Sequence, residues 1–327
     1  MKILDNILSA DSKRRKWEAV GYTALVSWLL TVLIIYGVGS YGVALFLLLP
    51  SCIGAFATVL YGYKNTITRK KATSIALLAL GIYTLGLLAF AIEGIICVVT
   101  AAPIALLLTW LGCLAGYTLI ENTSENPNSV LTTLILFIGL IPTMAFVEKD
   151  SAPALTSVTT TIEINASPET VWKNVVEFPE LTAPTELIFK SGIAYPTSAK
   201  IVGSGVGAIR YCNFTTGRFV EPITMWDEPR RLQFSVEEQP APMKELSFWD
   251  IDAPHLHDYF VSKRGQFTLT AQANGTTRLE GTTWYYHKIA PAFYWEIWSN
   301  YIVHSIHQRV LSHIKSKAEH EKQAQSQ

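Results

Sequence analysis

The chain has 327 residues, with 26 basic and 26 acidic side chains, and half of its residues are hydrophobic while only 16% are charged. Disordered proteins and proteins that coat nucleic acid need more charge than this, so we exclude both classes and expect no nucleic-acid partner. The length is that of about two domains of ordinary size.

Charge is distributed unevenly along the chain. Residues 17–147 contain only eight charged side chains, whereas residues 148–327 contain 37 of the 52 charges, all seven histidines and six of the nine tryptophans. The first part is therefore expected to be an integral membrane domain over residues 1–150, and the second a water-soluble domain over residues 151–327.

The membrane part is expected to hold about five spanning helices, because a bilayer core of about 30 Å takes about 20 apolar residues per helix. Segment 73–119 is too long for one crossing, and Glu93-Gly94 near its middle predicts a tight turn between two helices. A half-helix over 95–102 that re-enters the membrane is the alternative. A signal peptide is a poor explanation of the first segment, whose apolar run is long and is followed by further spans. The five expected helices are 19–37, 42–62, 73–91, 97–119 and 130–147.

Basic clusters predict which side of the membrane each end occupies. Lys13-Arg14-Arg15-Lys16 precedes the first span, and Lys64 with Arg69-Lys70-Lys71 follows the second, so both clusters should be cytoplasmic. Five spans then place the soluble domain outside the cytoplasm. The loop 121–129 has no Lys or Arg, and another number of crossings would reverse the side.

The second part alternates strand and turn signals between helices. Residues 156–166 read as a strand, and Ser167-Pro168 starts a helix through Val176, with Ser167 as N-cap. A second short helix is expected near 179–182, and a long helix from Pro291 to about Glu321 closes the chain. Asn274-Gly275 predicts a hairpin between the last two strands. The six further strands are expected at 197–203, 207–216, 218–226, 231–238, 259–273 and 276–288.

This order of elements, headed by Ile162-Glu-Ile-Asn-Ala-Ser-Pro-Glu-Thr-Val-Trp172, resembles the SRPBCC superfamily of START, Bet v 1 and polyketide-cyclase-like proteins. The resemblance covers about residues 156–320. It implies an α+β helix-grip fold, in which a curved antiparallel sheet surrounds a long C-terminal helix over an apolar cavity. Members of this superfamily bind lipids, sterols and polyketides, and some catalyse cyclisation, dehydration or hydrolysis.

Several side chains are candidates for lining or bordering such a cavity. The rings are Trp226, Tyr285 and Trp298, each of which could instead only fill the core. Arg210 and Glu221 lie on adjacent predicted strands and form either a structural ion pair or a polar group in the cavity. His255 belongs to a loop that is either a lid or simply solvated. His304 and His307 lie three residues apart on the last helix, with His307 at the border of its apolar face, and for both of them packing competes with ligand contact.

No cofactor and no metal are expected. The His255 and His257 pair lacks further ligands nearby, and the four cysteines form neither a CxxC motif nor a Cys/His set. We therefore expect membrane-anchored binding of a hydrophobic small molecule or lipid. A cyclase or hydrolase using Glu221 or a histidine as general acid–base is one alternative. A co-chaperone-like interaction domain is the other, so the sequence leaves catalysis undecided.

Overall fold

The computed structural model describes residues 8–123, 127–247, 249, 251 and 253–325. The chain divides into two compact units. The helical unit contains the described residues up to Ala152 together with 246–254 and 289–292, and the sheet unit contains 153–245, 255–288 and 293–325.

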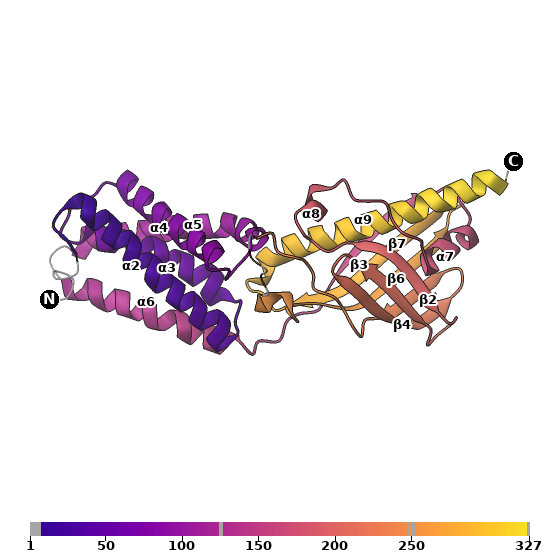
Figure 1. Ribbon diagram of the computed structural model, residues 1–327, viewed down its shortest axis with the longest axis horizontal. Coiled ribbons are helices and arrows are strands. Elements are labelled where there is room, and N and C mark those ends of the chain that lie inside the picture. The colour runs from indigo at the N-terminus through magenta and orange to yellow at the C-terminus, as the bar shows by residue number, and fades with distance from the viewer. Residues whose placement is uncertain (1–7, 124–126, 248, 250, 252, 326–327) are drawn as a thin grey trace. The chain divides into compact units, whose positions relative to one another are not determined.

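The helical unit consists of apolar helices joined by short turns (Figure 1). Among the described residues, four helical stretches are long and apolar enough to cross a membrane: Ser12–Val38, Ala44–Gly62, Arg69–Ala89 and Ile95–Asn122. The count of five spans stays a prediction. The helices are α2 (Ser12–Val32) continuing as η1 (Leu33–Val38), η2 (Ala44–Leu48) continuing as α3 (Leu49–Gly62), α4 (Arg69–Ala89), α5 (Ile95–Thr123) and α6 (Pro127–Glu148).

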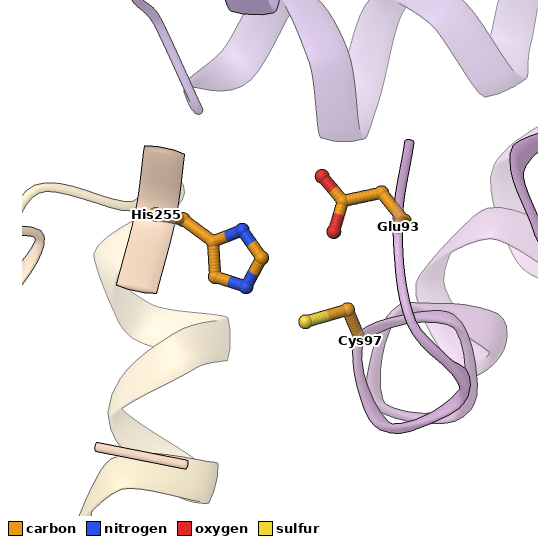
Figure 2. Close-up of side chains that lie close together, drawn as sticks. All are labelled: Glu93, Cys97 and His255. Atoms are coloured by element: carbon orange, nitrogen blue, oxygen red, sulfur yellow. The ribbon is translucent and has the colours of Figure 1, made fainter. Parts of the chain in front are cut away.

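The turn expected at Glu93-Gly94 separates α4 from α5, and α5 runs continuously through Pro103. Glu93 is buried in this turn, and Cys97 lies in the first turn of α5 (Figure 2). Their side-chain oxygen and sulfur atoms lie within 4.8 Å of each other. Glu93 therefore occupies the end of the α4–α5 hairpin instead of the middle of a helix.

Two glycines bring α3 and α5 into close contact. A Cβ on Gly54 would lie 1.9 Å from the carbonyl oxygen of Thr109, and a Cβ on Gly112 would lie 1.9 Å from that of Ser51. Neither position tolerates a side chain at this distance. Small residues that let backbones approach are the usual basis of helix packing in membranes, where lipid gives no hydrophobic drive.

Glu148 ties the end of α6 to the turn 39–43. Its carboxylate accepts hydrogen bonds from Ser40 Oγ at 3.0 Å, from the Val43 backbone at 2.8 Å and from the Ala44 backbone at 3.2 Å. The last two are free backbone N–H groups at the start of η2, so Glu148 caps that helix from another part of the chain. A Cβ on Gly42 would lie 2.2 Å from this carboxylate, which explains the glycine.

The sheet unit contains one seven-stranded antiparallel sheet, with α9 lying along one of its faces (Figure 1). The strand order is β1-β7-β6-β5-β4-β3-β2, so the first strand pairs with the last. This is the expected α+β helix-grip architecture. The strands are β1 (Thr156–Ile164), β2 (Pro196–Val202), β3 (Ile209–Phe214), β4 (Gly217–Asp227), β5 (Arg231–Ser235), β6 (Phe260–Ala271) and β7 (Thr277–His287).

The helices of the sheet unit are α7 (Pro168–Val176), α8 (Leu187–Lys190) and α9 (Ala292–Gln325), with a 3-10 turn η3 (Pro254–Leu256). Ser167 caps α7 through the Thr170 backbone, as expected. The short helix expected near 179–182 is wrong. Phe178 and Leu181 instead donate backbone hydrogen bonds to Ala199 and Thr197, so this segment runs beside β2 and the helix forms later.

Candidate functional site

The interior between the sheet and α9 holds two separate apolar clusters. The larger one includes Ile164, Leu279 and Leu311, and the smaller one contains Val158, Tyr285 and Val303. α9 approaches the sheet at Gly281, where a Cβ would lie 3.6 Å from the side chain of Leu311, a member of the larger cluster. Side chains alternate along a strand, so Leu279, Gly281, Thr283 and Tyr285 share the face that α9 covers.

A layer of polar side chains lies between these two clusters. Thr160 Oγ1 lies 2.8 Å from His304 Nδ1 and 3.1 Å from His307 Nδ1. His307 Nε2 lies 2.7 Å from Thr283 Oγ1. Along each element these residues separate members of the two clusters: Thr160 follows Val158 on β1, and Thr283 precedes Tyr285 on β7.

The polar layer forms a continuous chain of hydrogen bonds. Burial, and the neighbouring His304, lower the pKa of His307 to about 4, so its imidazole is neutral near pH 7. A neutral imidazole donates through one nitrogen and accepts at the other, and a hydroxyl has one proton to donate. The Thr160 hydroxyl can donate to one histidine and accept from the other, with the roles set by the tautomers, and Thr283 continues the chain at the other ring nitrogen of His307.

Tyr285 sits at the edge of the smaller cluster and is fully buried. Its ring stacks on Phe260 with centroids 4.9 Å apart, and its hydroxyl donates to Asn300 Oδ1 at 2.7 Å. Burial raises the pKa of Tyr285 to about 12, which keeps the hydroxyl protonated. Tyr285, a predicted site residue, therefore lies two residues beyond Thr283 on the same face of β7, next to the polar layer.

Arg210 and Glu221 form a buried ion pair within the larger cluster. They are direct cross-strand partners on β3 and β4, and only 2% of Arg210 and 5% of Glu221 is exposed. Burial is the largest single influence on the pKa of Arg210 and lowers it, but Glu221 and Cys212 together raise it by more, so the net direction is upward. The guanidinium therefore stays charged, with Glu221 as its counter-ion.

Three phenylalanine rings surround the Arg210 guanidinium. Its Cζ atom lies 5.6 Å from the ring centroid of Phe178, 5.2 Å from that of Phe234 and 5.8 Å from that of Phe267. Such contacts stabilise a desolvated cation. Arg210 Nε is buried and has no hydrogen-bond partner within the part of the chain described by the structure.

Cys212, two residues further along β3, is buried beside this pair. Burial, together with the nearby Glu221, raises its pKa to about 12. A thiol with so high a pKa is a poor nucleophile, so Cys212 is a buried packing residue beside the ion pair.

The other predicted residues take separate positions. Trp226 packs edge-on against Trp172, with centroids 5.5 Å apart, at the border of the larger cluster. Trp298 is half-buried on α9. His255 lies on η3 (Figure 2) and is buried, with its Nε2 3.8 Å from Glu245 Oε1.

Sequence reasoning named His304 and His307 as candidates but missed Thr160, which contacts both rings, and Thr283, which contacts His307. His304 is exposed, whereas His307 makes contacts with both strands. The helical periodicity did place His307 at the border of the apolar face. The missing information was the register of β1 against β7, which brings Thr160 and Thr283 under the same turn of α9.

The fold and this interior define a helix-grip domain that follows a group of apolar helices. Residues 156–319, half of the chain, match the family described as polyketide cyclase/dehydrase and lipid transport. The chain belongs to this family.

Solved structures resemble about half of the chain at low identity. A protein from Nitrosospira multiformis is 20% identical, with 51% of this chain and 99% of that chain covered and a TM-score of 0.34. Norcoclaurine synthase from Thalictrum flavum is 14% identical, with 51% and 94% covered and a TM-score of 0.33. A protein from Chromobacterium violaceum is 11% identical, with 50% and 96% covered and a TM-score of 0.32. No curated protein matches the chain.

Proposed function

We propose that the sheet unit binds a hydrophobic small molecule or lipid between its sheet and α9, and that the helical unit keeps this activity at a membrane. The observation that carries the proposal is the layer of Thr160, His304, His307 and Thr283 between two apolar clusters. A mostly apolar site with a few polar groups is typical of small-molecule binding.

The chemistry of the layer favours a ligand that is mainly apolar and has one hydrogen-bonding group. Hydroxyl and imidazole groups can each donate or accept, so the layer can adapt to either kind of polar group. Its most enclosed ring, that of His307, is neutral near pH 7, and the layer contains no acidic side chain. A ligand with a full charge would meet no counter-ion there, which makes an alcohol, ketone or neutral lipid the best fit.

Two further facts support a membrane-associated ligand. The family description includes lipid transport, and four helices among the described residues are long and apolar enough to cross a bilayer. Apolar molecules partition from water into lipid. A binding domain that is attached to spanning helices therefore acts where such ligands are concentrated.

The test is to identify molecules that remain bound to the full chain after mild detergent extraction, by native mass spectrometry and by analysis of the extracted lipids. Thr283→Val removes the hydroxyl that contacts His307 and keeps the side-chain shape. We expect the retained amount of one species to fall about fivefold, since a neutral hydrogen bond contributes about 1 kcal/mol.

Thr282→Val is the matched control. Thr282 is adjacent in sequence, but its hydroxyl lies on the other face of the sheet, 2.9 Å from that of Thr159. Lipids bound to the spanning helices should be equal in all three proteins. If no bound species distinguishes Thr283→Val from Thr282→Val and the unchanged chain, the proposed site is wrong.

A further inference from the structure

The first part of α9 has an apolar stripe that the protein leaves exposed. Phe293, Ile297 and Tyr301 are 68%, 64% and 55% exposed, respectively. Their spacing of four residues places them on one face of the helix. Large exposed apolar side chains that adjoin one another are typical of a surface that contacts a partner or a membrane.

The same face of α9 becomes polar further along the helix. His304, Gln308 and Ser312 continue the line at helical spacing, and all three are exposed. From Phe293 to Tyr301 the helix rises about 12 Å, at 1.5 Å per residue. The apolar character is therefore confined to one end of a helix face that is exposed over a much longer distance.

That end of α9 is attached to the helical unit. Residues 289–292 belong to that unit, and the Ala290 backbone donates a hydrogen bond of 2.9 Å to the carbonyl oxygen of Tyr41. Tyr41 lies in the turn between η1 and η2, where two of the apolar helical stretches meet. Phe293 is three residues beyond Ala290, so chain length alone keeps it within about 11 Å of this attachment for any direction of α9.

A turn between two spanning helices lies at the boundary of the bilayer, where headgroups meet acyl chains. Tyrosine and tryptophan rings are enriched in this layer, and helices that lie in it bury a face of aromatic and aliphatic side chains at the acyl boundary. Between Ala292 and Gln308 the sequence has one charged residue, Glu296. The composition of the stripe and its attachment point therefore agree on the same environment.

We propose that Phe293, Ile297 and Tyr301 form an interfacial contact with the membrane, in which the first turns of α9 rest in the headgroup–acyl boundary. The partner is the lipid surface itself. This contact would hold the beginning of α9 at the bilayer, and it does not depend on whether the sheet unit binds a ligand.

The test uses the full chain in phosphatidylcholine nanodiscs with a spin label on a single introduced cysteine. Ile297→Cys probes the stripe, and Gln308→Cys is the matched control on the same face of the same helix. Collision of the label with oxygen, which is concentrated in lipid, is compared with collision with a water-soluble nickel complex. The spectrum of the unchanged chain after the same labelling is subtracted, which removes any signal from native cysteines.

We expect oxygen collisions to dominate at 297 and nickel collisions to dominate at 308. Dominant nickel collisions at 297 would show a stripe in water and overturn the proposal. Low collision rates with both reagents at 297 would show that protein covers the stripe, either another part of this chain or a second copy, and would overturn it equally. Thermal unfolding of each labelled protein verifies that the fold is retained.

Discussion

The Arg210 and Glu221 pair concentrates charge inside an apolar core. Removing one partner leaves the other buried without a counter-ion, which typically costs about 3–5 kcal/mol of unfolding free energy. We therefore expect Arg210→Met and Glu221→Gln each to lower the free energy of unfolding of the full chain by about this amount. Denaturant unfolding in detergent, followed by near-ultraviolet circular dichroism, measures both.

The double variant Arg210→Met with Glu221→Leu separates charge from packing. Replacing a buried pair by apolar side chains of similar volume is often neutral or stabilising. We expect the double variant to recover most of the stability that either single variant loses. A double variant as unstable as the sum of the two single ones would show that shape, and not charge, holds this region together.

His307 makes the stability of the sheet unit depend on pH. Its pKa is about 4 in the folded chain, against 6.5 for an unperturbed histidine, because it is buried and lies next to His304. The unfolded chain therefore binds a proton between these values while the folded chain does not. The free energy of unfolding therefore has its full value, as far as His307 is concerned, above about pH 6.5, and it decreases as the pH falls toward 4.

The measurement is the melting temperature of the full chain from pH 7.5 to 4.5, compared with that of His307→Gln. We expect the variant to lose less stability over this range, since it has no imidazole to protonate. Burial also lowers the pKa of His313, but this group is common to both proteins, so their difference reports His307 alone. His320→Gln, an exposed histidine of the same helix, should follow the unchanged chain, and parallel curves for all three would refute the assignment.

Most strands and helices follow from local patterns. β1 alternates apolar and polar residues, and Asn274-Gly275 closes the β6–β7 hairpin with Gly275 at a φ of 77°. The segment 178–181 has no comparable pattern. It pairs with β2 through Phe178, which contacts Ala199, and Leu181, which contacts Thr197, so the contact depends on residues well outside the segment. Local sequence therefore could not locate the short helix.

The packing of α3 against α5 rests on glycine, which predicts a sharp response to substitution. Gly112→Ala would place a methyl group 1.9 Å from the Ser51 carbonyl oxygen, so the two helices must separate. We expect a loss of about 1–3 kcal/mol, the usual cost of overpacking. Thermal unfolding in a single detergent compares the variant with the unchanged chain.

Gly81→Ala in α4 is the control for the glycine substitution. A Cβ on Gly81 meets no atom within 4 Å. Alanine has the higher helix propensity, so this variant should be equal to or slightly more stable than the unchanged chain. Equal losses in Gly112→Ala and Gly81→Ala would contradict close packing as the reason for Gly112.

The polar layer could not be predicted from the sequence of any single strand or helix. Each of its members has an ordinary local context: a threonine in a strand, or a histidine near the apolar face of a helix. They converge because β1 pairs with β7 across more than 110 residues of sequence, with Val158 opposite Thr283. Helical periodicity orders residues along α9, but only this register determines which strand positions lie beneath them.

The side of the membrane that the soluble domain occupies stays a prediction of the whole chain. Basic residues cluster at the start of α2 and between α3 and α4, which should be cytoplasmic. With five crossings the sheet unit lies outside. We expect a membrane-impermeant maleimide to label Ser312→Cys in intact cells that express the chain.

Lys13→Cys provides the opposite case, because it precedes the first span within the basic cluster. It should react only after the cells are permeabilised. The unchanged chain gives the background from native cysteines, of which Cys52, Cys113 and Cys212 are buried. Labelling of Lys13→Cys in intact cells, with Ser312→Cys protected, would reverse the predicted orientation.

The sequence by itself determined the division between an apolar helical region and a charged soluble region, because transfer of side chains from water to lipid depends on composition alone. It also determined most of the order of strands and helices, since alternation, turn residues and helical periodicity are local, and its resemblance to a known superfamily implied the helix-grip fold. Only the tertiary structure decided that Arg210 meets Glu221 among three phenylalanine rings, and that Thr160, Thr283, His304 and His307 form one hydrogen-bonded layer. Those contacts depend on strand register and on the position of α9, which arise from long-range pairing that no local pattern encodes.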